Sequence, residues 1–374
     1  MKILLVTDDM HPGGVPRHVV DLANGLQKNG ITVSVAATDG NFRKRLHNEV
    51  KFIKINLLKK DSFDKNYYGI IICIFRIWSL LLSGKYDIVH SHKRFTHYLV
   101  KYLKHKIIHI TSYHTCFENK KYQTKYGDYT ICVSDSVRLQ MISKYGCDSN
   151  QIKTIYNGIA PFTVHNDKKK KMTYDRLGIS TDNKIIASVG AYIPSKDQST
   201  LIIAVNKLKI LNKIHNIKFV FQGYGKQEHE LKKLTNSLKL NETIIFVDSM
   251  FDVESLFNIS EFMILNPIHS EGFGIVMLEA ASLGKMHIGT KVGGIPEFIE
   301  DGITGKLIEA GNPEQLAQTI SFLLDNPNEY KRMGSNAKNK YEKYFGLDRM
   351  INETISVYDS VLNKNNYIRS EKDC

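Results

Sequence analysis

Short apolar runs alternate along the first half of the chain with segments whose apolar residues recur every three or four positions. A continuous apolar run of this length is typical of a parallel strand that is buried on both faces. The expected strands are KILLVT, ITVSVAA, YDIVHSH, IIHITSYH and YTICVS. Between the first two, residues 15–30 predict a helix with one apolar side and with Gly30 at its C-terminal cap. This alternation predicts a doubly wound parallel sheet.

The alternation stops and then restarts in the middle of the chain. Residues 156–179 are polar, contain Pro161 and four consecutive lysines, and predict a linker followed by a short helix. A second series of strands is expected at KIIASVGAY, IKFVFQGYG, TIIFVDS, EFMILNP and MHIGTKVGG. Residues 330–362 keep a helical period throughout, and one helix of that length could pack across both domains.

The length and the two series of strands predict two domains. A chain of 374 residues is too long for one ordinary core. We expect an α/β fold of two Rossmann-like domains that face a central cleft, with boundaries at 1–160 and 161–345. Ligands bind outside the carboxyl ends of parallel strands, so the loops that follow the strands are where chemistry is expected.

The most apolar segment is residues 69–84, GIIICIFRIWSLLLSG. It is shorter than the roughly 20 residues that a membrane-spanning helix needs, and Arg76 stands in its middle. It predicts a core helix or a helix that lies on a surface. The amino terminus passes from a short strand into a polar loop and does not resemble a signal peptide.

The cysteines are odd in number, scattered, and never in a C-x-x-C pair, which predicts reduced thiols in the cytosol rather than disulfides or a zinc site. They are Cys73, Cys116, Cys132, Cys147 and Cys374.

The charge is divided unequally between the two halves. Residues 1–160 contain 24 Lys and Arg against 12 Asp and Glu, a net charge of +12, whereas residues 161–374 contain 27 against 26, a net charge of +1. Together these give the +13 of the whole chain. Such an asymmetry predicts that the first domain meets an anionic partner.

Two glutamates draw attention to the segment HSEGFGIVMLEAASLGK, which begins at His269. Glu271 lies in the loop after a predicted strand, and Glu279 lies one turn into the next helix. The glycines beside Glu271 let backbone amides approach a ligand, and a helix N-terminus favours phosphate. Carboxylates accept hydrogen bonds from pairs of sugar hydroxyls. The segment therefore predicts a site for a nucleotide sugar, although a solvated Glu271 and an ordinary helical Glu279 would also fit this spacing.

The neighbourhood of this segment, residues 252–320, resembles the retaining glycosyltransferase family 4, which has the two-domain GT-B fold and the motif E-x(7)-E. The resemblance implies that Glu271 contacts sugar hydroxyls, that Gly272, Phe273, Gly274 and Ile275 bind the sugar and diphosphate, and that Glu279 binds the ribose. It also implies a C-terminal helix over 346–374 that packs back on the first domain.

The resemblance extends to the amino-terminal half. HPGGVPRHVVDLANGLQKNG looks like the family's glycine loop, which implies that Gly13 and Gly14 precede a helix N-terminus at the donor site. His114 takes the position of a family histidine that touches the transferred sugar. A single histidine after a strand is otherwise more often structural, and His90 and His92 are interpreted as scaffold.

The loop VGAYIPSKDQ resembles the one that supplies an Arg and a Lys to the donor diphosphate. Lys196 matches the Lys, but Ala191 stands where the family has Arg. FQGYGKQ matches a loop near the base, which implies that Gly223 and Gly225 bind the donor. The sequence has no D-x-D motif, so no metal and no cofactor is expected, and the nucleotide diphosphate sugar is a substrate.

The resemblance thus implies a retaining, metal-independent glycosyltransferase, with Glu271, Lys196 and His114 as its catalytic residues. It would move a hexose or N-acetylhexosamine, with UDP as the default carrier, to a cell-envelope glycan or a lipid-linked saccharide. Two alternatives stay open: a non-catalytic nucleotide-sugar-binding subunit, which Ala191 favours, and a sugar-nucleotide epimerase of the same architecture.

The basic first domain adds an expectation about location. Residues 93–104 interleave aromatic and basic side chains and could lie on a membrane as an amphipathic helix. They are Lys93, Arg94, Phe95, Tyr98, Leu99, Lys101, Tyr102 and Lys104. We expect a cytoplasmic protein on the inner face of the membrane, bound to anionic lipid. A solvated basic face is the alternative, and nucleic acid is not expected because no such motif is present.

Overall fold

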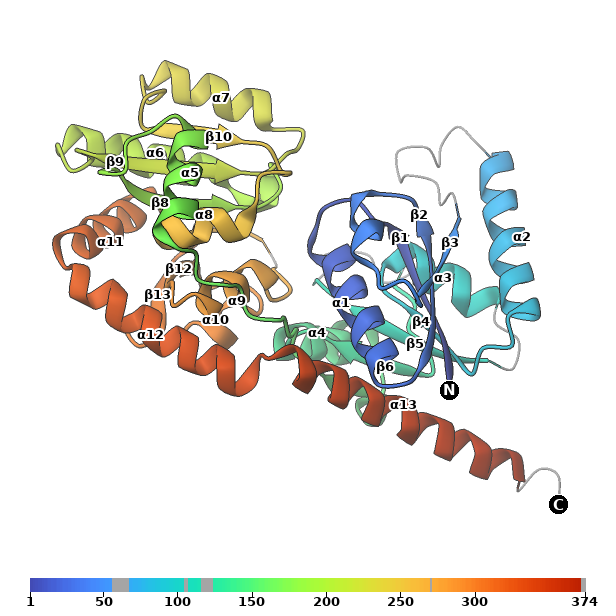
Figure 1. Ribbon diagram of the computed structural model, residues 1–374. Coiled ribbons are helices and arrows are strands. Elements are labelled where there is room, and N and C mark those ends of the chain that lie inside the picture. Colours follow the sequence, from blue (N-terminus) through green and yellow to red (C-terminus); the bar gives the residue numbers. More distant parts are fainter. Residues whose placement is uncertain (56–66, 104–106, 116–123, 270, 371–374) are drawn as a thin grey trace. The chain divides into compact units, whose positions relative to one another are not determined.

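The computed structural model describes residues 1–55, 67–103, 107–115, 124–269 and 271–370. The chain divides into two compact units (Figure 1). The N-terminal unit comprises Met1–Gly158 together with Leu347–Cys374, and the C-terminal unit comprises Ile159–Gly346.

The N-terminal unit is built on a seven-stranded sheet in the order β3-β2-β1-β4-β5-β6-β7, in which every pair of neighbours is parallel. Its strands are β1 (Lys2–Asp9), β2 (Thr32–Thr38), β3 (Lys51–Lys54), β4 (Ile88–Ser91), β5 (Ile108–Tyr113), β6 (Tyr129–Cys132) and β7 (Ile152–Thr154). The reversal between β1 and β4 is the doubly wound arrangement that the apolar runs predict.

Helices cover both faces of this sheet. They are α1 (Gly14–Lys28), α2 (Tyr67–Ser83), α3 (Arg94–Leu103), α4 (Asp135–Tyr145) and α13 (Leu347–Ser370), with short 3₁₀ turns at η1 (Asn41–Arg45) and η4 (Ser149–Gln151). Strand β1 shows the two-residue alternation that separates the faces. Ile3 and Leu5 join the core beneath α1 and α13, whereas Leu4 and Val6 join the core beneath α2 and α3. In Figure 1 α13 runs beside α1, far from it in sequence.

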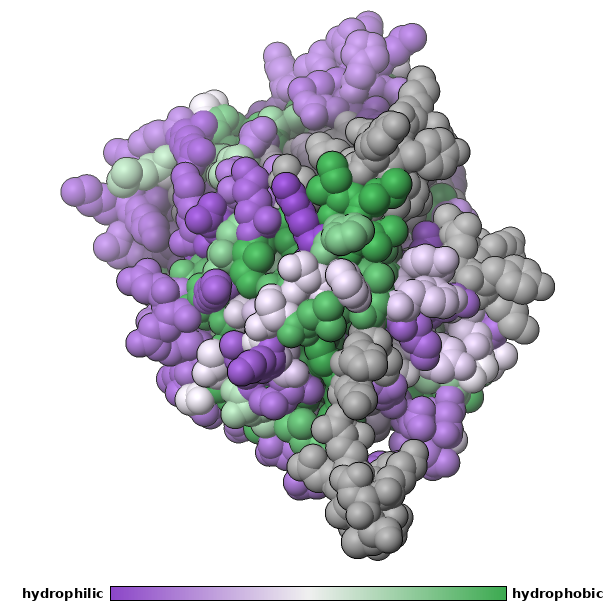
Figure 2. All heavy atoms as spheres, turned by 90° about the vertical axis from the view of Figure 1, so that its right-hand side faces the viewer, coloured by the Kyte–Doolittle hydropathy of each residue, from purple (hydrophilic) through white to green (hydrophobic). Residues whose placement is uncertain are grey.

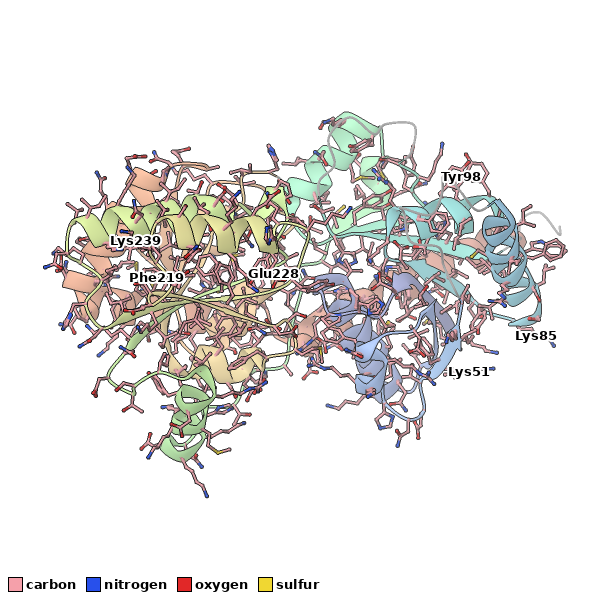
Figure 3. The ribbon with its side chains drawn as sticks, turned by 90° about the horizontal axis from the view of Figure 1, so that it is seen from above. Lys51, Lys85, Tyr98, Phe219, Glu228 and Lys239 are labelled. Carbon is pink, nitrogen blue, oxygen red and sulfur yellow. The ribbon has the colours of Figure 1, made fainter. Side chains whose placement is uncertain are left out.

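The C-terminal unit has a six-stranded parallel sheet in the order β10-β9-β8-β11-β12-β13. Its strands are β8 (Lys184–Val189), β9 (Ile217–Gln222), β10 (Ile244–Val247), β11 (Ser260–Leu265), β12 (His287–Thr290) and β13 (Gly305–Ile308). Its helices are α5 (Asp167–Leu177), η5 (Pro194–Lys196), α6 (Gln198–Ile210), α7 (Glu228–Ser237), α8 (Val253–Ile259), α9 (Ile275–Ser282), α10 (Ile295–Phe298), α11 (Pro313–Asp325) and α12 (Pro327–Tyr344). Phe219 lies inside this unit and Lys239 at its surface (Figure 3).

The ten predicted strands are all confirmed, whereas β3, β7 and β13 were not predicted. The helical period over 330–362 belongs to two helices, α12 and α13, so the expectation of one continuous helix is wrong. The break falls at Phe345, whose side chain is buried against Phe273 and Phe298 of the C-terminal unit. A buried ring outside the helical geometry, followed by Gly346, ends α12 there.

The apolar segment at 69–84 forms α2, one side of which packs on the sheet through Cys73, Ile77 and Leu81. Among the described helices, none combines the length and the apolar character that crossing a membrane requires. Cys73, Cys132 and Cys147 are buried. Cys116 and Cys374 lie outside the described residues.

Candidate functional site

The loop that carries Glu271 connects strand β11 to helix α9. The structure brings Glu271 together with Lys196, which ends the short turn η5 in the loop after strand β8. The Nζ of Lys196 donates to the Oε2 of Glu271, and the two side chains are only 24% and 13% exposed. Two of the three predicted catalytic residues, 75 positions apart, are therefore one ion pair.

Two hydrogen bonds to backbone carbonyls fix this pair of loops to each other. The amide of Ile268 donates to the carbonyl of Ser195 at 3.0 Å. The side-chain amide of Asn266 donates to the carbonyl of Asp197 at 2.7 Å. Because both loops follow neighbouring strands of the sheet, these two bonds hold Lys196 and Glu271 at one edge.

A third loop, after strand β12, supports Glu271 from behind. The amide of Gly294 donates to the carbonyl of Glu271 at 3.0 Å. Gly293 adopts a φ of +56°, and a Cβ there would lie 1.9 Å from the same carbonyl oxygen. Only glycine permits this approach, so the position of Glu271 depends on the backbone of residues 293–294.

Helix α9 begins beside this ion pair. Gly274 adopts a left-handed φ of +80° and caps the helix without a side-chain hydrogen bond. The first amides of a helix have no partner within it and attract anions. The side chain of Phe273 is buried against Phe298 and Phe345, so only its backbone can meet a ligand. Gly272 is buried, while Ile275 and Glu279 are half-buried.

Gly223 and Gly225 have a packing role that requires no ligand. A Cβ at Gly223 would lie 2.0 Å from the carbonyl oxygen of Gly190, and one at Gly225 would lie 2.3 Å from that of Tyr192. These glycines let the loops after β8 and β9 touch through their backbones. Their predicted contact with the donor stays a prediction.

The departure at Ala191 leaves Lys196 as the single cation of residues 190–197. The carbonyl oxygen of Ala191 accepts a hydrogen bond of 3.0 Å from the side-chain amide of Gln198. The loop is thus held in shape through its backbone without the arginine that the resemblance led us to expect.

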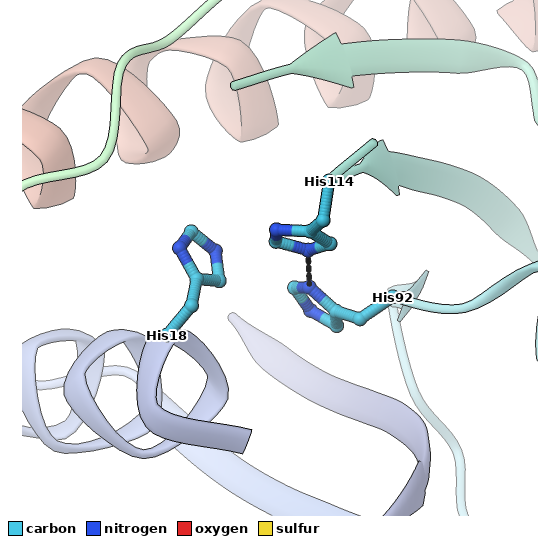
Figure 4. Close-up of side chains that lie close together, drawn as sticks. All are labelled: His18, His92 and His114. Atoms are coloured by element: carbon cyan, nitrogen blue, oxygen red, sulfur yellow. Dashed lines mark hydrogen bonds between the residues drawn. The ribbon is translucent and has the colours of Figure 1, made fainter. Parts of the chain in front are cut away.

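The N-terminal unit carries the third predicted catalytic residue, His114, which follows strand β5. Its Nε2 lies 3.3 Å from the Nδ1 of His92, which follows β4 (Figure 4). His18, in the second turn of α1, lies beside both, with ring centroids 4.7 Å from His114 and 5.4 Å from His92. Gly13 and Gly14 are exposed at the start of α1, where no side chain caps the helix. Sequence reasoning missed His18, whose signal is its place just after that glycine loop.

Burial keeps these imidazoles neutral. Burial lowers the pKa of His18 to about 4, although a hydrogen bond from its Nδ1 to Asn157 at 3.0 Å opposes the shift. Burial and the neighbouring imidazoles lower the pKa of His92 and of His114 well below the usual value. His90 is held by Tyr358 at 2.6 Å and Ser112 at 2.7 Å, which supports its interpretation as scaffold.

The three imidazoles of His18, His92 and His114 form a donor set of the kind that binds zinc. One nitrogen from each lies within 4.8 Å of the others. Two ligands of one tetrahedral zinc stand about 3.3 Å apart, given zinc–nitrogen bonds of about 2.0–2.1 Å. His92 and His114 have that separation, while the third imidazole would have to move inward.

Two carboxylates at the end of strand β1 also escaped the sequence reasoning. Burial raises the pKa of Asp8 to about 6, against the opposing charge of Lys93. Asp9 pairs with Lys93 at 3.0 Å, and although burial opposes it, that cation holds the pKa of Asp9 below its usual value. The signal was available, because DD directly follows the first predicted strand.

Comparisons with known proteins show what the chain is similar to. The family model for glycosyl transferases group 1 matches residues 170–340, and that for glycosyltransferase family 4 matches residues 12–161. An uncharacterized glycosyltransferase of Methanocaldococcus jannaschii is 28% identical over 96% of this chain and 98% of its own. The N-acetyl-alpha-D-glucosaminyl L-malate synthase of Bacillus anthracis is 28% identical over 57% of this chain and 55% of its own.

The fold has solved counterparts. The structure of Anabaena HepE in complex with UDP and glucose superposes with a TM-score of 0.82 at 18% identity, covering 96% of this chain and all of the other. That similarity concerns the fold, whereas the two family models between them reach both units of the chain. The chain therefore belongs to the family 4, group 1 glycosyltransferases, and its two parallel-sheet units have the GT-B fold.

Proposed function

We propose that this glycosyltransferase moves a hexose or N-acetylhexosamine from a nucleotide diphosphate sugar to an acceptor hydroxyl, with retention of configuration at the anomeric carbon. The observation that carries the proposal is the ion pair between Lys196 and Glu271 beside the start of helix α9. It places a cation, a hydrogen-bond acceptor and free helix amides at one edge of one sheet.

Each of these groups has a distinct part in the proposed reaction. Lys196 leaves Glu271 and neutralises the charge that develops on the departing diphosphate, together with the amides of α9. Glu271 then accepts hydrogen bonds from sugar hydroxyls. The bond between the anomeric carbon and the phosphate oxygen breaks, the acceptor oxygen attacks the same face, and the departing phosphate takes the acceptor's proton.

The cation and the helix amides supply the charge neutralisation that a metal ion supplies elsewhere, so we propose metal-independent transfer. Adding EDTA should leave the rate unchanged. Support for UDP as carrier comes from HepE, whose structure holds UDP and glucose, and support for an aminosugar comes from the name of the Bacillus anthracis relative. The predicted contact of His114 with the transferred sugar remains part of this proposal.

We propose that the acceptor is a cell-envelope glycan or a lipid-linked saccharide, and that the protein works in the cytoplasm on the inner face of the membrane. The net charge of +12 on residues 1–160 supports an anionic partner. Helix α3 itself is a poor candidate for the contact, because Leu99 is buried and Phe95 packs on the core. Lys104 lies outside the described residues.

The test compares two substitutions at the ion pair with two at a surface pair of the same unit. Glu271→Gln and Lys196→Ala should each lower kcat/KM for UDP-sugar turnover by roughly 100-fold, the usual cost of removing an electrostatic stabiliser. Lys207→Ala and Glu314→Gln break an exposed ion pair and should leave turnover unchanged. Near-normal rates in both ion-pair variants would refute the proposal.

Ala191 supports a second candidate, a nucleotide-sugar-binding subunit that turns over only with a partner chain. Isothermal titration would then show UDP binding while turnover stays absent. An Ala191→Arg variant separates the two candidates, because a rise in turnover from zero would identify a subunit that lost its catalytic cation.

A further inference from the structure

Helix α2 has an apolar surface on the side that faces away from the sheet. Its inner side is anchored by Cys73, Ile77 and Leu81, which are no more than 3% exposed. Its outer side carries large apolar residues that are 43% to 63% exposed. These outer residues, here called the α2 stripe, are Ile71, Phe75, Trp78 and Leu82, with Ile72 beside them. Figure 2 shows the hydrophobic atoms gathered on this face.

A helix on the surface of a globular protein normally turns polar side chains outward. Residues 71, 75, 78 and 82 instead recur at the spacing of one helix face, so the exposure is a continuous stripe. Scattered apolar residues on a surface need no explanation, whereas a contiguous patch marks a binding surface. Phe75 and Trp78 stand edge to face with ring centroids 5.8 Å apart, which makes the centre of the stripe aromatic.

The surroundings of the stripe are basic. Over residues 51–55 and 67–103 the described chain contains seven Lys and Arg against one acidic residue, Asp87. Lys51 and Lys85 are exposed, and Figure 3 places both on the N-terminal unit. Helix α3, which contacts α2, adds exposed Tyr98 and Tyr102, and the ammonium group of Lys125 lies 5.9 Å from the ring of Tyr102.

A groove with cations at its edge runs beside the stripe. It has a volume of about 430 Å³ and separates α2 from strand β3. Apolar side chains of Ile53, Ile55 and Phe75 line it, together with Lys54 and Arg76. Both of these cations are exposed, so the groove offers positive charge next to an apolar floor.

We propose that the α2 stripe lies in the headgroup layer of an anionic membrane, with Phe75, Trp78 and Leu82 among the acyl chains and Lys54 and Arg76 on lipid phosphates. Aromatic and aliphatic side chains ringed by cations are the composition of an interfacial helix. A second copy of the chain is a worse occupant, because pairing two such faces would bring their cations together. The proposal rests on the membrane attachment in the proposed function and names the surface that makes the contact.

Trp78 is the single tryptophan of the chain, so its fluorescence reports the stripe directly. Titrating the full-length protein with vesicles of phosphatidylcholine containing 30% phosphatidylglycerol should shift its emission to shorter wavelength. Brominated acyl chains should quench it. Pure phosphatidylcholine vesicles should give at least about tenfold weaker binding at low salt. An emission unchanged by anionic vesicles would overturn the proposal.

Substitutions distinguish the contribution of the α2 stripe to vesicle binding from the contribution of positive charge. Phe75→Ser with Leu82→Ser should weaken vesicle binding at least tenfold and leave Trp78 as the probe. Lys54→Gln with Arg76→Gln should abolish the preference for anionic lipid. The matched control is Ile210→Ser with Leu211→Ser, which removes apolar side chains that are 75% and 64% exposed on the C-terminal unit. Equal binding by the stripe variant and the control would refute the assignment.

Other occupants would be visible in the same samples. Sedimentation that shows a wild-type dimer and a monomeric stripe variant would identify a second copy instead of a membrane. Turnover of a UDP-sugar with a water-soluble acceptor should be unaffected by the stripe variants. A stripe variant that loses vesicle binding but keeps turnover would support the α2 stripe as the membrane surface. A wild-type protein that binds vesicles but does not turn over a UDP-sugar would refute the proposed reaction and leave the membrane surface standing.

Discussion

The two units of the chain share a parallel-sheet design but differ in where their charged and titratable groups lie, on loops in one and buried in the other. In the C-terminal unit, the candidate site lies on loops that are held by backbone hydrogen bonds and by glycines that allow close approach. In the N-terminal unit, titratable side chains lie inside the unit at the carboxyl ends of the strands. Buried histidines number five in the N-terminal unit and two in the C-terminal unit among the described residues.

This contrast gives the two units different responses to protons. In the C-terminal unit, hydrogen bonds to the backbone fix the loops that carry Lys196 and Glu271. Buried imidazoles and carboxylates make the N-terminal unit the more sensitive of the two to pH, because burial penalises their charged forms and this unit contains more of the buried histidines. In the C-terminal unit burial lowers the pKa of His287 to about 3. The two units should therefore respond differently to acid, and the predictions that follow test this difference.

The largest expected effect is the loss of the N-terminal unit in acid. The pKa of His18 falls from 6.5 in the unfolded chain to about 4 in the fold, so below pH 6.5 the unfolded chain binds more protons. Stability is complete above pH 6.5 and is lost as the pH falls towards 4. His18 alone should cost about 2.5 kcal/mol at pH 4.5. His90, His92 and His97, whose pKa values burial lowers further, add to it.

Hydrogen exchange at pH 7 and pH 4.5 measures this effect in each unit. Protection of β1, β4 and β5 should fall before that of β8, β9 and β11. The glutamine of His18→Gln cannot be charged. Between pH 7 and pH 4.5 this variant should therefore lose about 2.5 kcal/mol less unfolding free energy than the wild type does. If both units lose protection at the same pH, the N-terminal unit is not the more acid-sensitive of the two.

The difference between the units also sets how much the sequence could predict. Continuous apolar runs identified nine central strands, which are buried on both faces. They also identified β10, an edge strand whose four residues are all apolar. Strands β3, β7 and β13 escaped because they lie at the sheet edges, span three or four residues, and mix polar with apolar positions. Glu271 and Lys196 were predicted from a motif, and their pairing needed the structure. The sequence shows where His18 and Asp8 stand, after a glycine loop and after a predicted strand, but not the burial that shifts their pKa values.

The second prediction concerns Asp8 and has the opposite sign. Its pKa rises from 3.8 to about 6 in the fold, so the folded chain binds more protons between these values and stability falls as the pH rises through them. Asp8→Asn should therefore stabilise the protein by about 3 kcal/mol at pH 7.5, and by about 1.5 kcal/mol at pH 5. Urea unfolding at both values measures the difference.

The neighbouring Asp9 is a matched control for that experiment. Lys93 holds the pKa of Asp9 below its usual value despite burial, so its contribution is present above the usual carboxyl pKa and is lost in acid. Asp9→Asn should destabilise the protein at pH 7.5. If both variants shift stability in the same direction, Asp8 is not the buried acid that the geometry indicates.

The third prediction tests whether the C-terminal site depends on its backbone. Gly293→Ala would place a Cβ 1.9 Å from the carbonyl oxygen of Glu271, in addition to the strain of a left-handed alanine. We expect a loss of about 2 kcal/mol in stability and of roughly tenfold in turnover, because Glu271 must move. Gly302→Ala has the same strain at a φ of +73° but meets only a lysine terminus at 3.8 Å. It should cost about 1 kcal/mol and no turnover.

The smallest expected effect concerns the junction of α13 with α1, which places the end of the chain in the N-terminal unit. Gly25 of α1 faces Ile351 of α13, and a Cβ at Gly25 would lie 2.5 Å from the Cδ1 of Ile351. Alanine is favoured over glycine within a helix by about 1 kcal/mol, whereas overpacking costs about 1–3 kcal/mol. Ile351 is 1% exposed and has little room to turn away, so the clash should outweigh the helix propensity and Gly25→Ala should destabilise the unit by about 1 kcal/mol.

In an Ile351→Ala background the clash is absent, and the same substitution should become stabilising. Thermal unfolding of the four members of this double-mutant cycle measures the coupling. If Gly25→Ala costs the same free energy in both backgrounds, Ile351 does not contact position 25. The packing of residues 347–370 on the N-terminal unit would then be contradicted.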